Sequence, residues 1–413
     1  MFRERWQRTL WIMFFAQVVS AIGFASIFPF LPLYVASLGS QTGLSIEFWA
    51  GMAFSSQAIA MMIAAPIWGS LADRYGRKIM VERAMFGGTA IILLMAFVRS
   101  AEELVLLRTI QGFITGTISA TNALVAAAVP RERMGYAMGV LQVGYWAGVA
   151  IGPLIGGVLA DTLGYNAAFL VTAALLFLSG LVVLFGIKEE NAPSARAAQG
   201  KPGLLTQWWR ISIMPGVFMT FTVRFISGVG QMLVLPIVPL FIQSLLANEA
   251  PVGTLTGLIV GVSSATGTAS AISLGRLGDR IGHRRVLIIS SLLAALFYLP
   301  QSLVTDVWQL LVLQAITGAA MGGIMPPLSA LLAQYTPSGE EGAVYGLDSS
   351  VLSGSRAVAP LVGATVAVWL GLSGIFVVNG LVCLCAALCA IWWLPKTRMP
   401  LAQAMLEKAR REA

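Results

Sequence analysis

Long apolar stretches alternate with short polar ones along the whole chain. A dozen of these stretches have about 18 residues or more, so each can cross a hydrocarbon core of about 30 Å as a helix. An even number of crossings puts both ends of the chain on one side. We therefore expect an all-α integral membrane protein with twelve transmembrane helices, at about 9–37, 48–71, 79–98, 103–127, 137–160 and 166–186, and at about 211–245, 253–275, 285–304, 308–333, 342–369 and 373–394.

Composition indicates a lipid environment, and charge gives the orientation. Hydrophobic residues make up 57% of the chain and charged residues only 11%, against about 25% in soluble domains. Of the 26 Lys and Arg, 22 lie in alternate connections and at the two ends, whereas the opposite connections contain only Arg99. The positive-inside rule then predicts that both termini are cytoplasmic. The distribution of Lys and Arg that gives the net charge of +8 is therefore explained by the orientation of the chain in the membrane. It leaves no basic patch that could bind nucleic acid.

A repeat divides the chain into two halves. The segment GSLADRYGRK at 69–78 reappears as GRLGDRIGHR at 275–284, an offset of 206 residues, and Pro153 and Pro360 keep almost the same spacing at 207. One register across half the chain indicates a duplicated six-helix unit. We expect an N-terminal half at 1–187, a polar cytoplasmic linker at 188–210, a C-terminal half at 211–395 and a cytoplasmic tail at 396–413.

Four motifs occur in the first half, each in a different span or connection. The connection after the second span has the pattern G-x-L-A-D-R-x-G-R-K at 69–78. The fourth span has L-x-x-x-R-x-x-Q-G around Arg108, and the fifth has G-x-x-x-G-P-x-x-G-G at 148–157. The first span ends with I-G followed by Pro29 and Pro32.

Together these motifs resemble the major facilitator superfamily, and within it the twelve-helix drug:proton antiporters of bacteria. The resemblance covers essentially the whole chain. It implies a secondary transporter that exports amphipathic small molecules in exchange for protons, by alternating access. It also implies a monomer in the bacterial cytoplasmic membrane, in contact with lipids, and we expect neither a cofactor nor a metal.

The motif at 69–78 has the chemistry of a latch. Its glycines permit a tight turn, and the carboxylate of Asp73 can accept hydrogen bonds from amides at the N-terminus of a neighbouring helix. The resemblance implies that this neighbour is the eleventh span and that the latch holds the outward-facing conformation. The alternative is that the basic residues only fix topology. The latch candidates are Gly69, Asp73, Arg74, Gly76 and Arg77, with Asp279 and Arg280 in the second copy.

The fifth span presents a smooth stripe. Gly148, Gly152 and Gly156 are four residues apart, which lets another helix pack closely against them, and Pro153 weakens the helix backbone beside Gly157. We expect a seal and hinge at the interface of the halves. The alternative is ordinary packing of small residues.

Charges in the middle of the predicted spans, away from their ends, are few. They are Arg108, Arg224, Arg356 and Asp348, so the interior is net positive. Each costs at least about 2.5 kcal/mol to insert and therefore normally faces a cavity with a function. Asp348 is a candidate proton carrier, or else a fixed partner of an arginine. The resemblance assigns Arg108 a part in proton transfer, and the alternative is a structural arginine bonded to carbonyls of another helix.

Candidate substrate contacts lie on the spans that line the cavity in this family. They are Gln17, Gln142, Tyr145, Trp146, Phe221, Arg224, Phe225, Gln231 and Arg356. The first span has Gln17 where many drug antiporters have an acidic residue in or near it. This difference weakens the case for strongly cationic substrates and leaves neutral or anionic amphiphiles, including lipids, as the alternative.

Other functional classes find little support. The sole histidine, His283, lies in a connection, and the chain has neither an H-E-x-x-H zinc signature nor a G-x-S-x-G nucleophile elbow. An enzyme is therefore not expected, and the lack of a G-x-x-x-x-G-K-[ST] loop argues against ATP-driven transport. A receptor or channel stays open as a third class, although a latch motif in both halves favours a cycling carrier.

Overall fold

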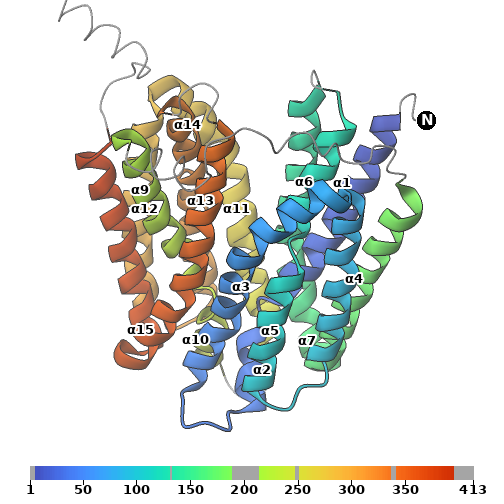
Figure 1. Ribbon diagram of the computed structural model, residues 1–413. Coiled ribbons are helices and arrows are strands. Elements are labelled where there is room, and N and C mark those ends of the chain that lie inside the picture. The colour runs from blue at the N-terminus through green and yellow to red at the C-terminus, as the bar shows by residue number, and fades with distance from the viewer. Residues whose placement is uncertain (1–4, 131–132, 188–213, 247–250, 336–340, 395–413) are drawn as a thin grey trace, which may run out of the picture.

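The protein folds into two helical bundles that lie side by side (Figure 1). The computed structural model describes residues 5–130, 133–187, 214–246, 251–335 and 341–394. The predicted linker at 188–210 and the predicted tail at 396–413 lie outside these residues. The described chain begins and ends at one face, at the top of Figure 1. We call it the terminal face, and the other the opposite face.

Helices make up each bundle. The first contains α1 (Arg5–Ser26), α2 (Leu31–Leu38), α3 (Ile46–Tyr75), α4 (Arg77–Met95), α5 (Ala101–Ile114), α6 (Thr117–Ala128) and α7 (Met134–Gly186). The second contains α9 (Pro215–Met232), α10 (Val238–Leu245), α11 (Val252–Ile281), α12 (His283–Tyr298), the 3-10 helix η3 (Leu299–Leu303), α13 (Val307–Gly322), α14 (Met325–Tyr335) and α15 (Glu341–Trp392).

The helices follow the predicted spans, with breaks that apolar length did not indicate. Seven helices in the described part are long and apolar enough to cross a membrane, and the longest two, α7 and α15, each contain two predicted spans. Four other spans are pairs of shorter helices, such as α5 and α6. These two separate at Gly116, whose φ of 125° lies in the left-handed region that favours glycine.

The turns recur with the spacing of the sequence repeat. Gly164 bends α7 with a φ of 84°, and Gly371 bends α15 with a φ of 76°, at positions 207 residues apart. Gly76 and Gly282, 206 residues apart, likewise have φ values of 107° and 100°. Equivalent glycines therefore turn the chain at equivalent places in the two halves.

Each half has its own hydrophobic core. Buried apolar side chains form four clusters, two toward each face, and every cluster draws its residues from one half alone. Burial of apolar surface therefore stabilises each half separately. The two bundles can move relative to each other without exposing a shared core.

The halves meet toward the opposite face. The main contacts are between α7 and α11 and between α3 and α15. Gly51 of α3 packs against the carbonyl of Pro360 and the side chain of Ala364, and Gly157 of α7 packs against the carbonyl of Gly253 on α11. A Cβ at either glycine would overlap backbone atoms of the other half, so the protein is closed at this face.

Candidate functional site

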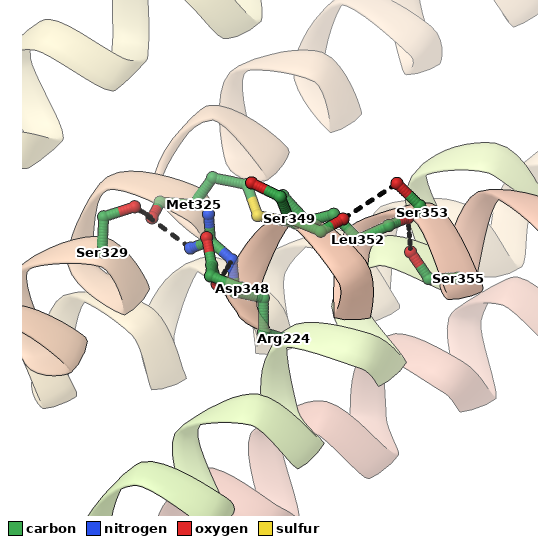
Figure 2. A network of polar contacts seen from close by, with 8 residues as sticks. All are labelled: Arg224, Met325, Ser329, Asp348, Ser349, Leu352, Ser353 and Ser355. Carbon is green, nitrogen blue, oxygen red and sulfur yellow. Dashed lines mark hydrogen bonds and ion pairs between the residues drawn. The ribbon is translucent and has the colours of Figure 1, made fainter. Parts of the chain in front are cut away.

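A buried ion pair lies inside the second half. Arg224 on α9 approaches Asp348 on α15, with 2.5 Å between Nε and Oδ1, and also donates a hydrogen bond of 3.0 Å from Nη1 to the hydroxyl of Ser329 on α14 (Figure 2). The two charged side chains are only 8% and 9% exposed. Because a lone charge at this depth would be strongly penalised, each ion stabilises the other. Arg224 is thus the arginine that pairs with Asp348.

Arg108 lies inside the first half and is 2% exposed. Its Nε donates to the carbonyl of Ala53 on α3 at 2.9 Å, and its Nη1 donates to Oε1 of Gln111 at 2.8 Å. The guanidinium also stands 5.7 Å from the centre of the Phe54 ring. These contacts match the structural alternative for Arg108, whereas Nη2 has no hydrogen-bond partner among the described residues. Arg108 and Asp348, both proposed for proton coupling, lie in different halves with different partners.

Arg356 differs from the other two intramembrane arginines. It is exposed, and within the described residues it forms neither an ion pair nor a hydrogen bond. It follows Asp348 on α15 by eight residues, about 12 Å, and precedes Pro360 at the contact between the halves by one turn. Its positive charge therefore lies next to the closed contact, and no described residue neutralises it.

Trp146 and Gln142 lie on the face of α7 that is turned toward the second half. Ala150 contacts Gly261 of α11, and Trp146 and Gln142 occupy the same helix face one and two turns toward the terminal face. Both are exposed, and the Trp146 ring packs edge-on against Tyr145, with 5.3 Å between centroids. These two side chains are therefore exposed on the helix face that contacts α11 further along, at Ala150.

The other substrate candidates divide into two groups. Phe225 and Gln231 on α9 are exposed. Gln17 is 2% exposed, with Oε1 lacking a partner in the described part of the chain, and Phe221 is 7% exposed within an apolar cluster of the second half. In this conformation the first group is therefore exposed on the protein and the second is buried within it.

The glycine stripe has a different partner from the one we expected. Gly148, Gly152 and Gly156 pack against α1, within the first half, and not against the second half. The reason is helix geometry, because residues four apart share one face of α7 and this face is turned toward α1. Gly157 and Pro153 lie on the neighbouring face and do contact α11. The motif thus joins α7 to α1 with its stripe and to the second half with these two residues.

The latch motif is only partly visible. The side chains of Asp73 and Arg74, and the environment of Gly69, are outside the described part. Gly76 forms the turn into α4. Nζ of Lys78 lies 3.4 Å from Oε1 of Glu82, and in the second copy Nε2 of His283 lies 3.4 Å from Oδ1 of Asp279.

Two contacts were not anticipated. Arg83 stacks over the Trp68 ring at 3.5 Å, and the indole N–H donates to the carbonyl of Phe113, which ties α4 to α3 and α5. At the opposite face, Asp161 of α7 accepts hydrogen bonds from backbone amides of Gly253 and Thr254. No spacing along the chain indicates either contact, because the partners are 15 to 93 residues apart.

Two separately packed membrane bundles, closed against each other at one face and containing buried ion-paired and polar groups, define a two-domain membrane carrier. The Major Facilitator Superfamily model matches residues 13–248 and again 220–409. The chain belongs to this superfamily and is therefore a multi-pass membrane transporter and not an enzyme.

Known proteins are similar along nearly the full chain. The "Multidrug resistance protein MdtG" of Enterobacter lignolyticus is 35% identical over 382 residues, which cover 92% of this chain and 90% of the relative. Two solved structures share the fold. A bacterial homologue of the lysosomal transporter Spinster has a TM-score of 0.80 and 13% identity, covering 97% of this chain and 100% of its own. The nucleoside transporter NupG has a TM-score of 0.76 and 14% identity, covering 95% and 100%.

Proposed function

We propose that the protein exports amphipathic small molecules from the bacterial cytoplasm in exchange for protons. The observation that carries this proposal is the 35% identity, over nine-tenths of both chains, to a protein named for multidrug resistance. The drug:proton antiporter motifs in the first half agree with it. Two independently packed halves supply the moving parts that alternating access requires.

The terminal face is the cytoplasmic one in this proposal. Basic residues concentrate in the connections on that side, as the positive-inside rule requires. The closed contact between the halves is then periplasmic, and the structure is inward-facing. Export begins from this state, because a compound in the cytoplasm or inner leaflet can enter from the side where the halves are apart.

Asp348 is the proposed proton carrier. Its carboxylate is neutralised by Arg224, so a proton that binds Asp348 releases the guanidinium for other contacts, and loss of the proton re-forms the pair. Ser329 keeps a hydrogen bond to Arg224 in the paired state. Arg108 has no carboxylate partner in the described structure, and we assign it to joining α5 to α3 beside the cavity.

Substrate contact is assigned to the accessible side chains. Trp146, Gln142, Phe225 and Gln231 offer apolar surface and hydrogen-bonding groups, as amphipathic compounds require. Arg356 adds a positive charge that no described residue neutralises. This charge favours a second class of substrates, neutral or anionic amphiphiles including lipids, over strongly cationic ones.

The loop at 69–78 is the proposed cytoplasmic latch. In the outward-facing state Asp73 would accept hydrogen bonds from the N-terminus of α15. The second copy of the motif, with Asp279 and Arg280, would make the equivalent contact from the second half to the first. The turn glycines Gly76 and Gly282 support this assignment, because both have the positive φ that a tight turn needs.

Flux in proteoliposomes tests the proposal. Purified protein is reconstituted with an imposed pH gradient, and a panel of cationic, neutral and anionic amphiphiles of similar size is offered. We expect gradient-dependent movement of at least one amphiphile against its own gradient. If none of the panel moves faster than in empty liposomes, multidrug export is the wrong function.

A further inference from the structure

One acidic side chain joins the two halves at the opposite face. Asp161 lies on α7, in the first half, and its two carboxylate oxygens accept hydrogen bonds from the first amides of α11, in the second half. The distances are 3.0 Å from the amide of Gly253 to Oδ1 and 2.6 Å from the amide of Thr254 to Oδ2. A carboxylate at a helix N-terminus is stabilised both by these bonds and by the helix dipole.

The surrounding backbone is shaped for this contact. Gly157, one turn before Asp161, packs against the carbonyl of Gly253, and Gly257 packs against the carbonyl of Pro153. These glycines bring α7 and α11 close enough for a short side chain to reach across. A Cβ on Gly253 would lie 2.8 Å from Oδ1 of Asp161 and 3.0 Å from the carbonyl oxygen of Gly157, so even alanine there would push the carboxylate and the α7 backbone away.

The second contact between the halves is chemically different. Where α3 meets α15, Gly51 packs on the backbone of Pro360 and on the methyl group of Ala364. Under the 207-residue offset, the counterpart of Asp161 is Val368, which has no acceptor for an amide. Among the described residues, the charged contact between the halves at this face therefore lies on one side, between α7 and α11.

We propose that Asp161 is a periplasmic lock that stabilises the inward-facing state and is released each time the transporter opens outward. The proposal rests on the alternating-access cycle proposed above. It makes Asp161 the counterpart of the Asp73 latch, because each carboxylate would close one face by capping a helix of the other half. Asp161 belongs to neither the proposed substrate site nor the proposed proton site, and it is a positioning residue that holds α7 against α11.

Distance measurements on spin labels test the lock. Labels are placed at Asn166→Cys and Leu303→Cys, exposed positions in different halves at the periplasmic face, after the three native cysteines are replaced. Asp161→Asn keeps the shape and removes the charge, Asp161→Ala removes both acceptors, and Asp161→Glu keeps the charge. Gly253→Ala displaces the carboxylate without changing it. All variants are checked for monodispersity and thermal unfolding in detergent.

Asp306→Asn is a matched control. Asp306 also caps a helix at this face, since its carboxylate accepts from the amide of Trp308 at 2.7 Å, but donor and acceptor belong to the same half. A general loss of helix capping would therefore appear in both variants. A change in the distance between the halves should appear only when Asp161 or Gly253 is altered.

We expect Asp161→Ala and Gly253→Ala to raise the ratio of open to closed periplasmic distances at least about three-fold. The rise should be smaller in Asp161→Asn and Asp161→Glu, and absent in Asp306→Asn. If the parent opens when a pH gradient or a transported amphiphile is added, but the Asp161 variants match Asp306→Asn, the lock is wrong and alternating access stands. If no variant or condition gives the open distance, both proposals fail.

Discussion

Arg224 and Asp348 form an ion pair between α9 and α15, and both side chains are almost fully buried. The two residues come from the first and fifth spans of the same half, 124 positions apart. The arrangement leaves Arg356 as an intramembrane arginine without a protein partner in the described structure. The described interior thus contains one neutralised pair, a buried Arg108 bonded to neutral groups, and an exposed positive charge at Arg356.

A pair of single variants and their combination separate the two roles of Asp348. Asp348→Asn and Arg224→Gln should each lower the free energy of unfolding by about 3 kcal/mol, because each leaves one buried group without its partner. The double variant should recover most of that loss. Thermal unfolding in one detergent measures all three proteins against the parent.

Transport then distinguishes a proton carrier from a fixed pair. If Asp348 carries the proton, the double variant regains stability but stays at least ten-fold slower than the parent in gradient-driven flux. If the pair is only structural, stability and flux recover together. The second result would remove Asp348 from the coupling mechanism.

The stripe on α7 predicts a sharp positional effect. A Cβ at Gly152 would lie 2.7 Å from the carbonyl oxygen of Ile22 and 2.8 Å from Cβ of Ala25, so Gly152→Leu should separate α7 from α1 and destabilise the first half by about 1–3 kcal/mol. Transport should fall at least ten-fold. Gly139→Leu is the control, because a Cβ at this position of the same helix would meet no atom within 4 Å, and it should keep near-parental flux. Equal flux in the two variants would show that the close packing is unnecessary.

Arg356 should set the preference for substrate charge. Arg356→Gln is expected to reduce transport of anionic amphiphiles about ten-fold relative to neutral ones of the same size, since a charge-assisted contact contributes about 1.5–3 kcal/mol. Arg356→Lys should retain much of the preference. Competition between paired anionic and neutral substrates gives the ratio directly. A ratio that does not change in Arg356→Gln would show that Arg356 does not set the preference for substrate charge.

Glu102 should make the stability of the fold depend on pH. This half-buried carboxylate, at the start of α5, accepts hydrogen bonds from the Ser40 hydroxyl at 2.8 Å and from the amides of Gln41 at 2.9 Å and Thr42 at 3.2 Å. Partial desolvation acts to raise the pKa of Glu102, but these and neighbouring hydrogen bonds outweigh it and lower the pKa from about 4.5 to about 2. The contact therefore needs the ionised form.

The sign of the effect follows from that lowered pKa. A carboxyl whose pKa is lower in the folded state stabilises the fold fully above its unfolded pKa, and the effect disappears as the pH falls through the folded value. The parent should be more stable than Glu102→Gln at neutral pH, and the difference should shrink between about pH 4.5 and pH 2. Thermal unfolding of both proteins across this pH range measures the difference in stability. A difference that stays constant with pH would exclude the ionised carboxylate as its source.

The fold could be predicted well because lipid imposes simple rules. Apolar length indicated the spans and the repeat indicated two halves, and the family match and the equivalent turns at Gly164 and Gly371 agree with both. Breaks inside spans were missed, as at Gly116, because a tertiary fold accepts a turn that apolar length alone does not reveal.

The site was harder to predict, for a physical reason. The sequence singled out Asp348 and three arginines but could not choose among them, since pairing depends on how α9 and α15 are rotated against each other. It also placed Gly148, Gly152 and Gly156 at the interface of the halves, whereas α7 turns them toward α1. The sequence did not single out Asp161, because its partners are backbone amides, which no residue type reveals.

Opposite movement of substrate and proton is the most direct test of the proposed mechanism. Protein in liposomes with a trapped pH-sensitive dye is given an outward gradient of a transported amphiphile and no initial pH difference. We predict that the lumen acidifies as the amphiphile leaves, and that Asp348→Asn abolishes the acidification. Efflux of the amphiphile at constant lumen pH, or with protons moving in the same direction, would contradict proton antiport.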